Sequence, residues 1–381
     1  MSVMAASDIR EQAAQRFAQL GWPSTKLEEW KYTNVAPIAR VDWRFDDMGR
    51  ALVPSTFING RGTTNATSHP LFAKYADYMR HPFVALNTAN AQDGALIVVP
   101  DGEIVDGFIH LRFVGEGDGV WSHPRNLIVV GRNAQVKILE EYSGRGSYFT
   151  NAVTEIVAGE GAVIDHTRLQ CESGDAFHVS TVQIHQERAS SVTARTIAFG
   201  GALSRLETNV ALKGEGASAM LDGLFVLRGR QHVDNQTLID HARPHCDSLE
   251  LYKGILDDSA RGIFDGRIIV RPDAVKTNSR QVNHNLLLSE TAIVDSKPTL
   301  EIHNDDVKCN HGSTIGQLDE EALFYLRARG IGENDARNLL VYAFASQIVD
   351  RIGVEEVREQ VRRAMFAHMP ERVPERREEP R

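Results

Sequence analysis

The segment NAQVKILEE, from Asn133 to Glu141, alternates apolar and polar residues directly after a turn. Two later segments repeat this texture at starts roughly 28 residues apart, GAVIDHTRL at Gly161–Leu169 and SSVTARTIAF at Ser190–Phe199. A period of two indicates β-strands, because successive side chains of a strand point to opposite faces. Strands that recur at this spacing with no helical pattern between them favour a β-solenoid, in which each coil buries its inward residues on its neighbours.

The same texture continues from about Leu96 to Thr314, although its spacing drifts in the later segments Gly216–Leu227, Ser259–Val270 and Thr291–Ile302. Short strands separated by Gly, Asn and Asp turns are also typical of a β-sandwich, which is the alternative fold. We predict a mainly β protein with a solenoid core over residues 91–317.

Helical patterns flank this region on both sides. Apolar residues recur at helical spacing from about Ser7 to Leu20, and we assign residues 1–90 to an N-terminal helical or mixed region. Three further helices are predicted for a C-terminal domain at residues 318–369, at Asp319–Gly330, Asn334–Gly353 and Val354–Met369. The proline-broken, charged tail at 370–381 is expected to be disordered.

The last two helices have candidate apolar stripes that would pack on the rest of the molecule. The first stripe is Leu339, Leu340, Ala343, Phe344 and Ile348. The second is Val354, Val357, Val361 and Met365.

Composition and charge narrow the class of protein. The net charge of −9 over 381 residues argues against a nucleic-acid or anionic-membrane surface, since such binding needs clustered Lys and Arg. The three scattered cysteines, Cys171, Cys246 and Cys309, form no disulfide framework and fit a reducing compartment. The first residues have no continuous apolar stretch, and no apolar run approaches the length of a bilayer span. We therefore expect a cytoplasmic protein.

The stretch LEIHNDDVKCNHGSTIGQL, from Leu300 to Leu318, contains a Cys-x-His pair. On a strand, Cys309 and His311 share one face with Cα atoms about 6–7 Å apart, so both can meet one ligand. Two ligands are too few for a closed metal site, which needs four. Either other segments or another chain supply the rest, or the pair is a packed thiol beside a hydrogen-bonded histidine.

Two other patterns suggest chemistry less strongly. In HARPHC, at His241–Cys246, the imidazoles of His241 and His245 would lie about 13 Å apart on a flat strand, so we interpret the motif as a solenoid corner. The pairs Asp257–Asp258 and Asp305–Asp306 are candidates for the two carboxylates of a polysaccharide hydrolase or lyase. Adjacent strand residues face opposite sides, so turns are the preferred interpretation of both pairs.

Several long, polar, non-repetitive blocks resemble one known family. The segment from Asp234 to Ile331, with LEEWKYTN at Leu27–Asn34 and FVALNTANAQDGALIVVP at Phe83–Pro100, is similar to the SufB/SufD family of iron-sulfur cluster assembly proteins. The block KPTLEIHNDDVKCNHGSTIGQLDEEALFYLRARGI, from Lys297, looks like the SufD branch.

The resemblance implies a right-handed parallel β-helix between helical regions, in a scaffold shared with a SufB-like subunit and a SufC-like ABC-type ATPase. His311 matches the family histidine that faces the cluster cysteine of SufB, and Cys309 matches its neighbour at the subunit interface. The pair would thus be half of a site for a nascent iron-sulfur cluster. His284 stands where many SufD-like chains carry arginine.

This resemblance favours a non-catalytic subunit over the alternative β-helix hydrolase or lyase. No Gly-rich phosphate loop stands between a strand and a helix, so ATPase activity is expected to reside in the partner. The isolated chain is expected to bind no cluster stably and is able to pair with a second copy. The residues expected to bind the ATPase are Leu323, Tyr325, Leu339, Leu340 and Phe344.

Overall fold

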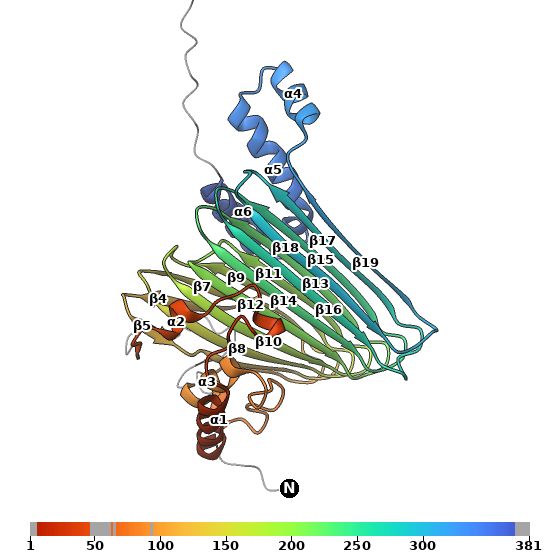
Figure 1. Ribbon diagram of the computed structural model, residues 1–381. Coiled ribbons are helices and arrows are strands. Elements are labelled where there is room, and N and C mark those ends of the chain that lie inside the picture. The colour runs from red at the N-terminus through yellow and green to blue at the C-terminus, as the bar shows by residue number, and fades with distance from the viewer. Residues whose placement is uncertain (1–5, 46–61, 64–65, 92–93, 370–381) are drawn as a thin grey trace, which may run out of the picture.

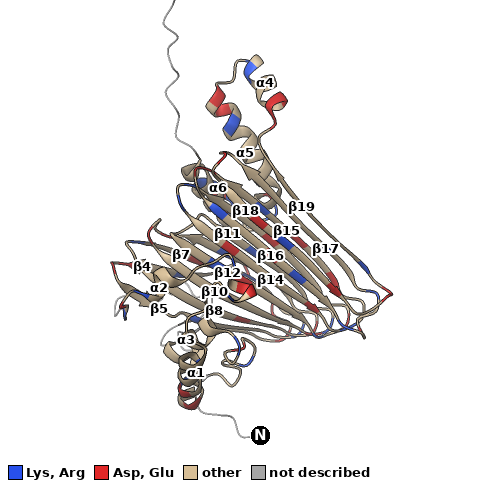
Figure 2. Cartoon of the chain, viewed as in Figure 1, with Lys and Arg blue, Asp and Glu red and all other residues tan. Residues whose placement is uncertain are grey.

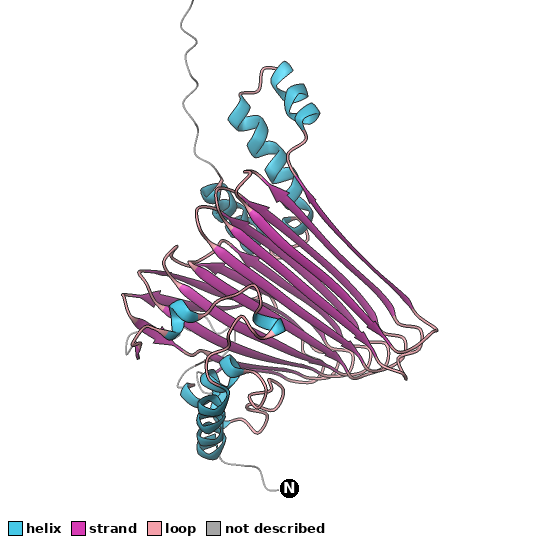
Figure 3. Cartoon of the chain, in the orientation of Figure 1, coloured by secondary structure: helices cyan, strands magenta, loops and turns pink. Residues whose placement is uncertain are grey.

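The computed structural model describes residues 6–45, 62–63, 66–91 and 94–369, which form a parallel β-solenoid with helices before and after it (Figure 1). The predicted solenoid fold is confirmed. Among the described strands every pair is parallel except β2 with β3, which excludes the alternative β-sandwich. Figure 3 shows the strands as one continuous stack with helices at both ends.

Each coil contributes one strand to each of two sheets. The first sheet contains β2 (Gly62–Thr63), β3 (Leu96–Val99), β6 (Arg125–Val130), β8 (Phe149–Ala158), β10 (Phe177–Gln186), β12 (Leu203–Leu212), β14 (His232–His241), β16 (Arg261–Val270) and β18 (Ile293–Ile302), with β1 (Arg44–Phe45) and β5 (Val120–Ser122) beside it. The second contains β4 (Ile109–Glu116), β7 (Gln135–Arg145), β9 (Val163–Cys171), β11 (Ser191–Ala198), β13 (Ser218–Leu227), β15 (Asp247–Leu256), β17 (Asn278–Leu287) and β19 (Lys308–Gly316).

The repeat in the sequence is one coil of the solenoid. The three segments that predict the fold are β7, β9 and β11, neighbouring strands of the second sheet. Because pairing is in register, like residues stack: Val136 lies beside Ile164, which lies beside Val192, all buried in the main core. The inward faces of both sheets contribute to this core, so each coil covers its neighbour.

The N-terminal region covers the outer face of the first sheet. It contains α1 (Ala6–Leu20), the 3-10 turns η1 (Glu28–Trp30) and η3 (Ala66–Ser68), α2 (Ala36–Ala39) and α3 (Pro82–Asn90). The Trp30 ring lies 3.9 Å from the guanidinium carbon of Arg205 on β12. The hydroxyl of Thr33 donates to Asp234 on β14 at 2.6 Å. The LEEWKYTN segment therefore anchors this region to the solenoid.

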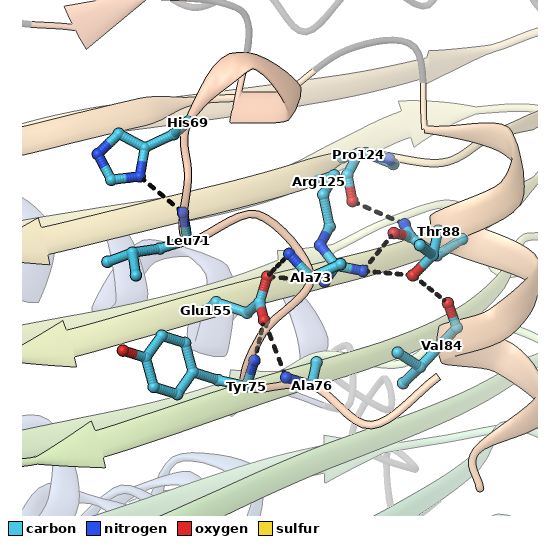
Figure 4. A network of polar contacts seen from close by, with 11 residues as sticks. His69, Leu71, Ala73, Tyr75, Ala76, Val84, Thr88, Pro124, Arg125 and Glu155 are labelled. Atoms are coloured by element: carbon cyan, nitrogen blue, oxygen red, sulfur yellow. Dashed lines mark hydrogen bonds and ion pairs between the residues drawn. The ribbon is translucent and has the colours of Figure 1, made fainter. Parts of the chain in front are cut away.

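A second anchor is the buried ion pair between Arg125 on β6 and Glu155 on β8, at 2.7 Å (Figure 4). Arg125 donates to the Thr88 hydroxyl of α3 at 2.8 Å. Glu155 accepts the backbone N–H groups of Tyr75 and Ala76 at 2.7 and 2.9 Å. Both side chains point outward from the solenoid, and they are buried because the N-terminal region covers them.

The C-terminal helices α4 (Glu320–Ala328), α5 (Glu333–Val349) and α6 (Glu355–His368) agree with the three predicted segments. Asp319 caps α4 by accepting the N–H groups of Glu321 and Ala322. Residues of α5 and α6 share a core with outward side chains of the second sheet. Figure 1 shows α4 projecting beyond the strands, and Figure 2 shows both signs of charge on it.

One predicted stripe is confirmed and the other is wrong. The buried residues of α6 are Val357, Val361 and Met365, as predicted. Those of α5 are Ala336, Val341, Ala345, Ile348 and Val349, so only one member of its predicted stripe is buried. The run from Leu339 to Ala345 is apolar on every side of the helix, so periodicity does not select the face that meets the sheet.

No helix among the described residues combines the length and apolar character needed to cross a bilayer. The predicted disordered tail, 370–381, lies outside the described residues.

Candidate functional site

Cys309 and His311 lie on β19, the outer strand of the second sheet. Within the described chain β19 pairs with β17, in a register that places Cys309 beside Ser279 and His311 beside Gln281. Ser279 and Gln281 are buried in the solenoid, so the Cys-His pair shares the face that continues its interior. The alternation on the strand therefore places both residues as predicted, at the open end of the solenoid.

The two side chains differ in exposure. Cys309 is half-buried and packs against the main core, whereas His311 is exposed. Burial raises the pKa of the Cys309 thiol, and the backbone of Ser279 opposes this rise. A cation or metal brought close by another molecule would favour the thiolate, which is the form that binds soft metals.

The chain does not complete a metal site around this pair. Across the ranges that the structure describes, no three His, Cys, Asp or Glu residues lie close enough together to hold an ion. Cys171 lies at the end of β9 against the C-terminal helices, and Cys246 is buried at a corner. The pair thus offers one sulfur and one nitrogen ligand, with further ligands left to another molecule.

The surface around the pair has the character of an interface. Residues of β18 and β19 are half-buried or exposed, whereas those of β16 are mostly buried. Exposed apolar side chains on and beside these two strands are Ile293, Ile302 and Ile315. The outer edges of β18 and β19 have backbone groups able to pair with strands of another chain.

The HARPHC motif forms a solenoid corner. His241 is the buried last residue of β14, with Nε2 2.9 Å from the Ser248 hydroxyl. His245 occupies the turn with a φ of 59°, and the Cys246 thiol lies 3.3 Å from the carbonyl oxygen of Gly214.

His284 on β17 has Nδ1 2.6 Å from the Thr314 hydroxyl.

The paired carboxylates lie in turns. Asp258 has a φ of 52° and accepts the Gly229 N–H in the turn after β15. Asp306 lies in the turn before β19 and pairs with Lys276 at 2.7 Å. Neither pair has the two carboxylates facing one cleft that a hydrolase or lyase needs.

Only part of the predicted ATPase-binding set is accessible. Leu323 is buried on α4, so little of its side chain is open to a partner in this structure. Leu340 and Phe344 are half-buried, and Lys253 of β15 lies over the Phe344 ring at 4.2 Å. Tyr325 and Leu339 are 56% and 50% exposed, and neighbouring Phe324, which the sequence analysis did not name, is 74% exposed.

Two interior residues beneath the pair were also missed. Glu250 on β15 and Gln281 on β17 are fully buried, and the Gln281 amide donates to Glu250 Oε2 at 2.7 Å. In-register pairing places Glu250, Gln281 and His311 in one column across three coils. Their spacing of 31 and 30 residues equals one coil, so the repeat itself was the signal that could have found them.

Glu250 should make stability depend on pH. Burial raises its pKa to about 7 from an ordinary value of 4.5, against the opposing hydrogen bonds of Thr237 and Gln281. The folded state thus binds the Glu250 proton more tightly than the unfolded chain does. The stability that this proton contributes is fully present below pH 4.5 and is lost as pH rises through 7. From pH 5 to pH 8 the free energy of unfolding of the wild type should fall by about 2 kcal/mol relative to that of Glu250→Gln, because the glutamine does not titrate.

Urea unfolding at both pH values measures this difference. The exposed Glu116 provides the control, since Glu116→Gln should track wild type at both pH values. If the free energy of unfolding changes equally with pH in Glu250→Gln and in wild type, Glu250 is not the group that causes the pH dependence.

Comparison with known proteins agrees with this geometry. The family model described as "SUF system FeS cluster assembly, SufBD core domain" matches residues 113–344, and "SufBD protein N-terminal region" matches residues 1–53. The chain belongs to the SufBD family. Membership supports a role in iron-sulfur cluster assembly.

Individual relatives cover nearly the whole chain. An iron-sulfur cluster assembly SufBD family protein of Synechocystis sp. is 33% identical, over 93% of this chain and 89% of its own length. The iron-sulfur cluster assembly protein SufD of Escherichia coli is 27% identical over 96% and 92%. The chloroplastic protein ABCI7 of Arabidopsis thaliana is 31% identical over 93% and 84%.

Proposed function

We propose that this chain is a non-catalytic, SufD-like scaffold subunit that assembles nascent iron-sulfur clusters with a SufB-like subunit and a SufC-like ATPase in the cytoplasm. The observation that carries the proposal is an incomplete Cys-His site on the open edge of the solenoid, in a member of a family named for cluster assembly.

The cluster is cargo held between two chains. His311 and Cys309 provide a nitrogen and a sulfur ligand, and the SufB-like subunit provides the others. Strands of that subunit pair along β18 and β19, which bring backbone donors and acceptors to the contact. Alone, the chain offers too few thiolates for a stable cluster.

The ATPase binds the projecting part of the C-terminal domain. Phe324, Tyr325 and Leu339 expose aromatic and apolar surface on α4 and α5, and exposed aromatic residues are common anchors of interfaces. Phe344 holds α5 against the sheet, because it packs on the core that α5 and α6 share with the second sheet and its carbonyl oxygen accepts the Lys253 ammonium at 2.8 Å.

Co-expression with a SufB-like and a SufC-like protein tests the proposal. The mass of the intact complex under native conditions should show all three chains together, and the complex should carry iron and sulfide. The chain expressed alone should be folded and colourless, as a monomer or homodimer. Purification as a homodimer in the presence of both partners would contradict the proposal.

Surface variants locate the ATPase contact in the same experiment. The triple change Phe324→Ser, Tyr325→Ser, Leu339→Ser should weaken ATPase binding about tenfold or more and leave SufB-like binding intact. Phe366→Ser is the matched control, because Phe366 is an exposed aromatic residue on α6. Equal ATPase retention by the triple variant and the control would show the placement to be wrong.

A further inference from the structure

The interior of the second sheet changes character beneath the half-site. Its cysteine column, the in-register stack that ends at Cys309, runs through Val136, Ile164, Val192, Ala219, Ser248, Ser279 and Cys309. Its histidine column, the in-register stack that ends at His311, runs through Ile109, Ile138, His166, Ala194, Leu221, Glu250, Gln281 and His311. From β15, three strands from the open end, the residues that follow in both columns are polar or cysteine, whereas in the earlier strands His166, which contacts Glu140 at 2.8 Å, is the one polar member.

A buried polar side chain costs free energy unless it is hydrogen-bonded, and apart from His166 the earlier coils have apolar residues at these positions. In the cysteine column the cost is offset by hydrogen bonds, because the hydroxyls of Ser248 and Ser279 are 2.7 Å apart and His241 contacts Ser248. The histidine column leaves two acceptors open among the described residues, Glu250 Oε1 and Gln281 Oε1, and of these two residues Gln281 is the one paired in register with His311.

The orientation of the Gln281 amide follows from Glu250. Glu250 Oε2 accepts the amide N–H of Gln281 at 2.7 Å, and above its pKa of about 7 the carboxylate can only accept hydrogen bonds. The amide oxygen is then the atom left for another donor. The next residue in the column is His311, whose ring carries an N–H.

The opposite sheet leaves room for this amide. Gly266 on β16 faces it, and a Cβ atom at that position would overlap Gln281 Nε2 and crowd Phe264. Gly266 lies within a strand and is not among the positive-φ glycines, so its lack of a side chain serves close approach rather than a turn.

We propose that Gln281, held by Glu250, is a positioning residue for His311: its Oε1 accepts one imidazole N–H and leaves the other ring nitrogen for the shared site. This inference rests on the proposed function. An imidazole has two nitrogens, and a hydrogen bond to one selects the tautomer and orientation in which the other binds metal.

The test measures iron and sulfide content of the co-expressed complex. Gln281→Met keeps the length of the side chain without its amide and should lower cluster content about tenfold. Gly266→Ala should also lower it, because the methyl group displaces the amide while Glu250 and Gln281 remain. Asn283→Leu is the matched control, since Asn283 is equally buried on the same strand but pairs in register with Ser313.

A swap of the pair separates positioning from packing. Glu250→Gln combined with Gln281→Glu retains a hydrogen-bonded pair with an acceptor beside His311, so it should recover most of the cluster content that Gln281→Met loses. A role in folding alone would lower the melting temperature of the isolated chain in step with cluster content, and we expect no such correlation.

Two results would overturn the inference. The first is full cluster content in the Gln281→Met complex under conditions where the His311→Ala complex loses its cluster. The second is a loss of cluster content in the Asn283→Leu complex that equals the loss in Gln281→Met. If His311→Ala itself retains full content, the proposed function fails first. If Gln281→Met does not fold, the Gly266→Ala complex decides instead, and full iron and sulfide content in that complex would overturn the inference.

Discussion

Replacement of His311 by alanine is expected to remove most of the cluster from the co-expressed complex while the isolated chain stays folded. The ring is exposed, so its loss should change the free energy of unfolding by no more than about 0.5 kcal/mol. Imidazole binds iron and carries a proton at neutral pH, and alanine does neither. Iron and sulfide analysis of the complex, with thermal melting of the single chain, measures both effects.

His303→Ala is the matched control, because His303 is also exposed and follows directly after the edge strand β18. It should leave cluster content unchanged. Cys309→Ser then separates thiolate chemistry from packing, since serine keeps the size of the side chain and removes the thiol. Full loading of the His311→Ala complex would refute the shared site.

The largest expected loss of stability comes from Arg125→Met. Both members of the Arg125–Glu155 pair have fully buried side chains, and Glu155 also binds backbone N–H groups of the N-terminal region. Removal of the cation leaves a buried carboxylate without its counter-ion, which costs about 3–5 kcal/mol. The region around residues 66–91 should loosen first, because this pair ties it to β6 and β8. Urea unfolding and limited proteolysis measure the two effects.

Arg132→Met provides the control, because Arg132 pairs with Asp101 at the surface, where both side chains are more than half exposed. It should unfold close to wild type. Adding Glu155→Gln to Arg125→Met should recover part of the stability, since the neutral amide removes the uncompensated charge. If Arg125→Met unfolds at the same denaturant concentration as wild type, the pair is not the anchor.

Local pattern was sufficient for much of this architecture. The strands β7, β9 and β11 were predicted because alternation and turn residues act within one segment, and the coil repeat marks each return of the chain. The face shared by Cys309 and His311 followed in the same way. The stripe of α5 failed because several of its faces are apolar, and the choice among them depends on the sheet it meets.

Other features depend on residues that are distant in the sequence. Trp30 reaches Arg205, and Glu155 becomes buried through a segment about eighty residues earlier in the chain. No local signal specifies such contacts, because they require the solenoid to be formed first. Which residues of α4 and α5 are exposed is likewise decided only when the helices pack, and this packing leaves Phe324 exposed and Leu323 buried.

The sequence alone thus carries the strand period, the coil length, the helix boundaries and the Cys-His pair, all of which arise from interactions between near neighbours. The column of Glu250, Gln281 and His311 arises from parallel register, which joins residues 30 and 31 positions apart. A shift of one residue would turn these side chains to the opposite face. Pairing across coils therefore places a buried carboxylate beneath the half-site, and that pairing is a property of the folded chain.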